Sequence, residues 1–129
     1  MMMKRWKTVL LLLGFCLFLV SCSGSNSPAD VVVAYYNALV AGDASSLSQL
    51  SCADWEQQSK LMLDSFTGVK ARVDNIVCSE LENDGSSAAV NCKGKIIATY
   101  GTEDQEIDLS NTTFLLQKQG GEWLVCGQK

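Results

Sequence analysis

The sequence predicts an α+β domain in which helices come first and pack on one face of an antiparallel sheet. Apolar residues recur at helical spacing from Val32 to Phe66, and after Gly68 they alternate with polar residues, as in half-buried strands. Turn signals at Asn83–Gly85 and Gly120–Gly121 divide this second part into strands. Helices followed by a meander of strands are typical of an α+β fold.

Three helices are predicted before the strands. The first follows Ser27, a favourable N-cap, with Pro28 at the first helical position and Asp30 at the third, as in a capping box. Gly42 is the predicted end of this helix. The other two helices are expected over about residues 44–50 and 53–66. The last one places its large apolar residues on one face: Trp55, Met62, Leu63 and Phe66.

Four strands are predicted, over residues 70–82, 87–100, 105–117 and 122–127. On the first strand, Val73, Val77 and Leu81 are expected to share a face. The acidic stretch Glu103–Asp108 lacks the ligand spacing of a calcium loop and is interpreted as a solvated turn. On the third strand, one face is expected to carry Ile107, Leu109, Thr113 and Leu115.

The N-terminus has the layout of a secretory signal. Lys4, Arg5 and Lys7 precede an uncharged run of 13 residues, Thr8–Val20. The alternative is an uncleaved membrane helix, but a spanning helix needs about 20 apolar residues. We therefore expect this segment to direct export.

The apolar run ends in Leu-Val-Ser-Cys, residues 19–22. This sequence resembles the lipobox of bacterial lipoproteins, and the alternative is an ordinary signal peptide with a chance cysteine. The resemblance implies cleavage before Cys22, a diacylglycerol on its sulfur, and an anchor that holds the protein in the cell envelope, facing outside the cytoplasm. The predicted parts are a signal peptide (1–21), the lipidated cysteine with a flexible tether (22–27), and one domain (28–129).

Composition excludes several classes of function. Without the leader, seven basic residues face fourteen acidic ones, so a nucleic-acid partner is not expected. The chain has no histidine, which excludes Ser-His-Asp and Cys-His catalysis. No phosphate-binding or dinucleotide fingerprint is present, and no cofactor is predicted.

Four cysteines of the predicted domain are expected to form two disulfides, because an even number in an exported domain is typical of such bonds. A zinc site is the alternative, but no CxxC pair is present, and no metal is predicted. Cys78 and Cys92 flank the first hairpin turn, which favours Cys78–Cys92 with Cys52–Cys126. Facing cysteines there would put Val73 and Val77 out of step with the second strand unless a bulge intervenes, so the pairing Cys52–Cys78 with Cys92–Cys126 stays open.

The order of elements resembles the cystatin-like superfamily, which includes nuclear transport factor 2 and ketosteroid isomerase. The matching features are a first helix that ends in Gly42-Asp43 and a last strand, within Gly120–Gly127, that carries a tryptophan. The resemblance implies a cone between helices and sheet. Candidate pocket residues are Tyr35, Tyr36, Trp55 and Trp123.

The expected function is the non-enzymatic binding of a small ligand in this cone or of an envelope partner. The alternative is an isomerase or dehydratase of the ketosteroid-isomerase type, with a tyrosine beside Asp74 or Asp108. Both aspartates are expected to point away from the cone, because they alternate with apolar neighbours. A homodimer formed through the sheet is a further hypothesis, with Ile76, Ile97 and Phe114 facing outward.

Overall fold

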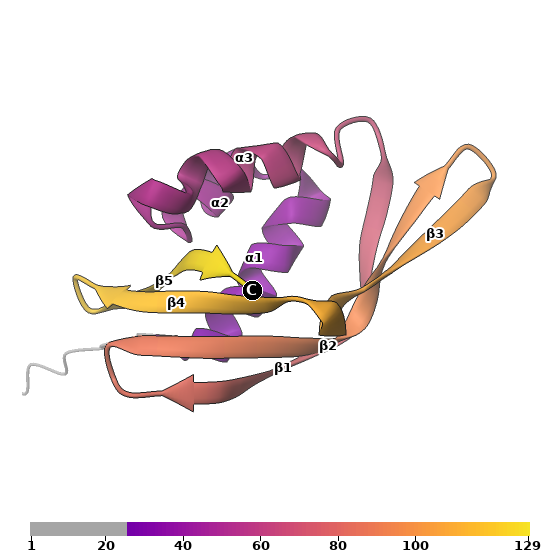
Figure 1. Cartoon of the computed structure of the whole chain (residues 1–129). Helices are drawn as coiled ribbons and strands as arrows, with labels where there is room; N and C mark the ends of the chain where they lie inside the picture. Colours follow the sequence, from indigo (N-terminus) through magenta and orange to yellow (C-terminus); the bar gives the residue numbers. More distant parts are fainter. Residues whose placement is uncertain (1–25) are drawn as a thin grey trace, which may run out of the picture.

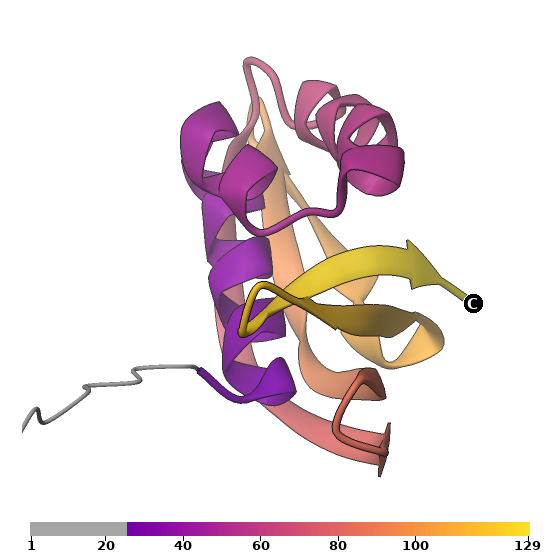
Figure 2. The same cartoon turned by 90° about the vertical axis from the view of Figure 1, so that its left-hand side faces the viewer.

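Helices and strands form two layers in the computed structural model, which describes residues 26–129 (Figure 1). Three α-helices pack on a five-stranded antiparallel sheet, so the α+β class is confirmed. Figure 2 shows α1 packed along the sheet and α3 above one end of it. The elements are α1 (Pro28–Ala41), α2 (Ala44–Gln49), η2 (Ala53–Trp55), α3 (Glu56–Asp64), β1 (Lys70–Asn83), β2 (Ser87–Tyr100), β3 (Glu103–Asp108), η3 (Leu109–Asn111), β4 (Thr113–Gln119) and β5 (Glu122–Gln128).

Helix α1 begins and ends as predicted. The Ser27 hydroxyl accepts the backbone N–H of Asp30 at 3.1 Å, and the Asp30 carboxylate accepts the backbone N–H of Ser27 at 3.4 Å, which completes a capping box. Gly42 ends the helix in the left-handed conformation, at φ 69°. The buried face of α1 includes Tyr35 and Leu39, which pack into the core between helix and sheet.

A bulge in β1 explains the side-chain pattern of the first hairpin. Val73 lies opposite Ile96, and the register shifts between Asp74 and Val77, where Asn75 has φ 52°. The extra residue turns the next side chains to the other face, so Val77 is 63% exposed. The prediction that Val73 shares a face with Val77 and Leu81 is therefore wrong. Leu81 is also exposed and lies at a second register shift, between Glu80 and Glu82.

The structure contains the disulfide pairing that the first hairpin favours. Cys78 lies opposite Cys92 in the β1–β2 ladder, and their Cα atoms are 4.0 Å apart. Cys52, just before η2, is bonded to Cys126 on β5, with Cα atoms 4.9 Å apart. The bulge in β1 is what reconciles facing cysteines with the inward position of the residues before it.

Backbone bonds reinforce the second disulfide. Ser51 forms a parallel bridge with Val125 on β5. The Cys52 N–H donates to the Val125 carbonyl at 2.8 Å, and the Val125 N–H donates to the Leu50 carbonyl at 2.8 Å. The loop before α3 is therefore held against β5 by a covalent bond and by its backbone.

The predicted third strand, residues 105–117, is two strands. The acidic stretch forms β3, which pairs with the second half of β2, while β4 pairs with the first half. Between them the chain makes the short helix η3, capped by the Asp108 carboxylate, which accepts the Ser110 N–H at 2.9 Å. The prediction of a solvated turn at Glu103–Asp108 is wrong, because β2 is long enough to pair with a strand there.

The break at η3 also changes which residues face the core. Phe114 and Leu116 of β4 are each 1% exposed, so the prediction that Phe114 faces outward is wrong. Ile76 packs against the core after the bulge, and Ile97 is buried between its ladder partners Arg72 and Glu106. None of the three residues proposed for a dimer is freely exposed. Within residues 26–129, no helix is long and apolar enough to cross a membrane.

Candidate functional site

The interior of the cone is filled by side chains of the protein itself. Tyr35 and Tyr36 project from α1 onto Phe114 of β4, with ring centroids 5.1 and 5.4 Å apart and edge-on geometry. Tyr35 is 0% exposed and Tyr36 is 4% exposed. These two predicted pocket residues therefore belong to a close-packed core in this structure.

A chain of hydroxyl groups crosses the buried end of α3. The Trp55 indole N–H donates to the Tyr35 hydroxyl at 3.2 Å, and that hydroxyl is 2.7 Å from the Ser59 hydroxyl. Ser59 is in turn 2.8 Å from Ser51, whose hydroxyl donates to the Leu47 carbonyl at 2.7 Å. Every member of this chain has a partner, so it fixes the positions of α1, α3 and the loop between them.

Ser51 and Ser59 were not among the predicted site residues. Ser59 follows Trp55 by four residues and precedes Met62 by three, so it lies on the face of α3 that the apolar pattern marks as buried. A small polar residue on an otherwise apolar helical face is the signal that could have identified it.

Burial controls the ionisation of both tyrosines. Burial, with a smaller contribution from the neighbouring Tyr35, raises the pKa of Tyr36 to about 12. Burial also raises the pKa of Tyr35, while hydrogen bonds from Ser59 and Trp55 act in the opposite direction. Both phenols therefore keep their protons at neutral pH and can donate hydrogen bonds, but they do not serve as bases there.

The two candidate carboxylates lie away from the tyrosines. Asp74 is partly exposed and is 3.8 Å from the Arg72 guanidinium. Asp108 is exposed and caps η3, and its hydrogen bonds to Ser110 lower the pKa of its carboxyl group. Both expectations that these side chains point away from the cone agree with the structure. Of the residues from 26 to 129, the buried polar ones are serines, so no carboxylate stands beside a tyrosine in the cone.

The two candidate tryptophans differ in exposure and in contacts. Trp55 is half-buried and bonds to Tyr35, whereas Trp123 on β5 is 7% exposed and belongs to the hydrophobic core. The Lys118 ammonium lies 5.8 Å from the centre of the Trp123 ring, a distance typical of a cation–π contact. A hydrogen bond therefore joins Tyr35 to Trp55, while Trp123 belongs to the same hydrophobic core as Tyr35.

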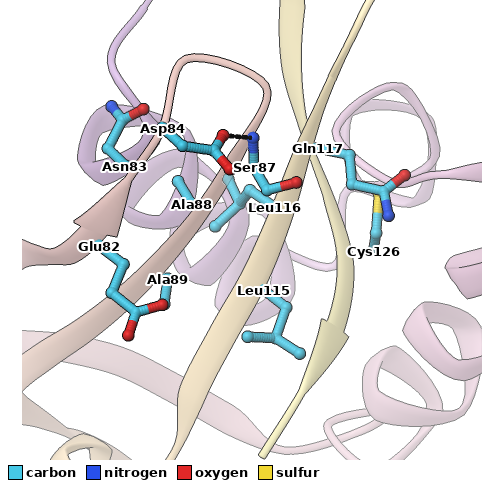
Figure 3. Close-up of a pocket in the computed structure, with 10 residues that line it drawn as sticks. All are labelled: Glu82, Asn83, Asp84, Ser87, Ala88, Ala89, Leu115, Leu116, Gln117 and Cys126. Carbon is cyan, nitrogen blue, oxygen red and sulfur yellow. Dashed lines mark hydrogen bonds between the residues drawn. The ribbon is translucent and has the colours of Figure 1, made fainter.

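A surface hollow of about 610 Å³ lies over β2, β4 and the turn between β1 and β2 (Figure 3). Its apolar lining includes Ala89 and Leu115, and Glu82 and Gln117 are among its polar residues. At its rim the Asp84 carboxylate accepts the backbone N–H of Ser87 at 2.7 Å, the bond that the dashed line of Figure 3 marks. The sequence did not indicate this hollow, because Ala89 lies in a run of three apolar residues that shows no alternation.

No group of histidine, cysteine, aspartate or glutamate residues within 26–129 has a metal-binding arrangement. The Cys52, Cys78, Cys92 and Cys126 sulfurs are all used in disulfides. Cys22, the predicted lipid attachment site, lies outside the described residues, as does the rest of the predicted signal peptide.

Comparison of the sequence with protein-family profiles and with curated proteins finds no match. Solved structures are similar in fold. A nuclear transport factor 2-like protein with a cystatin-like fold from Novosphingobium aromaticivorans superposes with a TM-score of 0.55, at 12% identity, over 78% of this chain and 75% of that one. A candidate dehydratase of the same family from Streptomyces avermitilis gives 0.53, at 17% identity, over 76% and 87% of the two chains.

A third neighbour is a candidate polyketide cyclase from Pseudomonas putida. It has a TM-score of 0.52 and 17% identity, and the match covers 81% of this chain and 92% of that one. Identities this low show the fold alone. The domain therefore has the cystatin-like fold that the order of elements predicted.

Proposed function

We propose that this chain is an exported lipoprotein, anchored through Cys22, whose domain acts by presenting its surface to another molecule of the cell envelope. The lipobox-like sequence at residues 19–22 supports the anchor. Two disulfides within one small domain support an oxidising compartment, where such bonds persist.

The observation that carries the surface function is the closed interior. Tyr35, Tyr36 and Phe114 occupy the cone, and the hydroxyl chain from Trp55 to Ser51 has no unpaired member. A ligand in the cone would have to displace a packed aromatic ring and break these bonds. We therefore favour recognition at the surface over ligand binding inside.

We do not transfer the activities named for the structural neighbours. A catalyst of the ketosteroid-isomerase type needs a carboxylate beside its phenol. Asp74 and Asp108 lie elsewhere, and Tyr35 and Tyr36 face serine, tryptophan and phenylalanine side chains instead. Native mass spectrometry of protein purified from its own host tests this point. We expect the mass of the processed lipoprotein alone, and a co-purified small molecule would contradict a closed cone.

Self-association is a second way in which the surface could act. Val77 and Leu81 are 63% and 60% exposed on β1, and both are large apolar residues. Light scattering of the detergent-solubilised chain, compared with a Val77→Lys, Leu81→Lys double variant, tests it. A dimer that the double variant loses supports pairing through this face, and a monomer at all concentrations excludes it.

Cys22→Ala tests the anchor. We expect the variant to leave the membrane fraction and the detergent-rich phase, because stable anchoring needs more than one acyl chain and Cys22 is where these chains would attach. The matched control is Cys16→Ala, which changes another cysteine of the leader and should leave anchoring intact. An unchanged membrane fraction for Cys22→Ala would show that the lipoprotein assignment is wrong.

A further inference from the structure

We propose that the free edge of β3 is a docking site for an extended, basic polypeptide segment, which adds to the sheet as a further strand. This proposal rests on the surface function proposed above and deepens it, because it names the surface and the chemistry of the partner. Strand addition of this kind uses backbone hydrogen bonds for affinity and alternate side chains for specificity.

The edge of β3 is open. Strand β3 pairs with β2 along one side, and no other strand within residues 26–129 pairs with its second side. All six residues of β3 are exposed. Figure 1 shows that the β2–β3 hairpin projects beyond the helical layer, so an incoming segment can approach the edge without meeting the helices.

The hairpin geometry sets which backbone groups face this edge. Tyr100 lies opposite Glu103 across a two-residue turn in which Gly101 has φ 66°. Residues of an antiparallel ladder alternate between those bonded to their partner strand and those directed away from it. Because the closing pair of such a turn bonds to its partner, Asp104 and Glu106 direct their backbone N–H and C=O groups to the open side.

The charge of β3 selects the partner. None of its six residues is basic, and four are acidic: Glu103, Asp104, Glu106 and Asp108. Asp104, Glu106 and Asp108 lie on one face at alternate positions, so an added strand would need lysine or arginine at every second position to match them. Two copies of β3 would place like charges opposite each other, which disfavours self-pairing at this edge.

A hollow beside β3 fits a long cationic side chain. Its volume is about 430 Å³, and its lining includes Asp74, Glu106 and Asp108, together with Lys95. The Lys95 ammonium is 2.9 Å from the Glu106 carboxylate, so one of these three carboxylates already forms an ion pair. An incoming lysine or arginine would meet the other two carboxylates, of which Asp74 lies 3.8 Å from the Arg72 guanidinium and Asp108 uses one oxygen to accept from Ser110.

Fluorescence anisotropy with a labelled peptide of about eight residues, long enough to cover a strand of this length, tests the proposal. Lysine and threonine alternate in the probe, and the target is the full chain in detergent micelles. We expect binding that weakens as salt concentration rises. A peptide of alternating lysine and proline carries the same charge but has fewer backbone donors. Equal binding of the two peptides would overturn strand addition.

Variants separate the two contributions. Asp104→Asn removes one charge and should weaken binding about two- to fivefold, the range of a cross-strand pair. Asp104→Pro also removes the backbone N–H that faces the open side, a change that an edge strand tolerates. This variant should weaken binding by about a further tenfold. The control Glu122→Gln removes a carboxylate at the start of β5 and should leave peptide binding unchanged. Equal binding by Asp104→Asn and Asp104→Pro would reject the backbone contribution.

Lys95→Met provides a test that damage to the fold cannot imitate. The variant frees the Glu106 carboxylate, so we expect tighter binding of the lysine–threonine peptide by about two- to fivefold. Unchanged or weaker binding would contradict the assigned role of Glu106. Peptide binding does not depend on the lipid, so failure here with a membrane-bound chain rejects the β3 site alone, whereas loss of the anchor leaves this measurement unaffected.

Discussion

Replacing Gly94 with alanine would test whether the close approach of the β1 and β2 backbones at the bulge stabilises the domain. Gly94 has φ 107°, a backbone conformation that residues with a side chain rarely adopt. A Cβ atom added there would lie 2.6 Å from the Asn75 carbonyl oxygen and 2.8 Å from the Asp74 carbonyl oxygen. Both neighbours are backbone atoms, so relief requires movement of β1 rather than of a flexible side chain.

Two costs add at this position. The unfavourable φ costs about 1–3 kcal/mol. Moving a packed strand to admit a methyl group costs about another 1–3 kcal/mol, as for other overpacked sites. We therefore expect Gly94→Ala to lower the free energy of unfolding by about 2–6 kcal/mol, a large part of the roughly 5–15 kcal/mol that stabilises a domain. The matched control is Gly120→Ala. Gly120 has φ 59° and open space around an added Cβ, so this substitution should lower the free energy of unfolding by about 1–2 kcal/mol.

Urea unfolding of the two variants and the parent chain, with disulfides intact, gives the comparison. Tryptophan fluorescence reports on the core, and far-ultraviolet circular dichroism reports on the backbone, so agreement of the two probes checks for two-state behaviour. A Gly94→Ala variant that is no less stable than Gly120→Ala would refute the close approach of β1 and β2 at this point.

Two further predictions concern stability. Removing Cys52–Cys126, which closes a separation of 74 residues, should cost about 4.4 kcal/mol, against about 3 kcal/mol for Cys78–Cys92 with its separation of 14, by loop entropy. Paired alanine variants compared by urea unfolding check this order, and the reverse order would contradict it. Stability should also fall as pH rises from about 10 to 12, because unfolded tyrosine loses its proton there while the raised pKa keeps buried Tyr36 protonated. Tyr36→Phe should reduce this loss of stability, and an identical pH profile for the variant would contradict the prediction.

Local signals in the sequence predicted much of the fold. Ser27, Asp30 and Gly42 mark the two ends of α1 because each acts on backbone groups within a few residues. The Cys78–Cys92 bond was favoured because a hairpin turn brings nearby residues face to face. These predictions depend on short-range geometry, which is determined by residues that are close together in the sequence.

Predictions that depend on register over a long distance were wrong. One extra residue at Asn75 reverses the face of Val77, a second register shift lies at Leu81, and the break at η3 reverses the face of Phe114. Alternation in the sequence does not show where such an interruption occurs. Strand β3 was predicted only in part, as residues 105–108 of a longer strand, since its pairing depends on the length of β2 and its own residues are mostly acidic.

The candidate site was only partly predictable. Tyr35 and Trp55 are two of the four candidate pocket residues, and a direct hydrogen bond joins them. The Ser59 hydroxyl, which also bonds to Tyr35, belongs to a residue type that a list of reactive residues passes over. Whether the cone is open or filled depends on the volumes of side chains from α1, α3 and β4 together. No single segment of the sequence carries that information.

The Cys52–Cys126 bond also sets how far the protein can be stretched. A chain pulled between residue 26 and residue 129 would extend to about 360 Å if fully unravelled. With the bond intact, the 74-residue separation is bypassed, and only the segments on either side can lengthen, to about 100 Å. A domain tethered at one end and gripped by a partner elsewhere would therefore resist tension with most of its sheet still enclosed in a covalent loop.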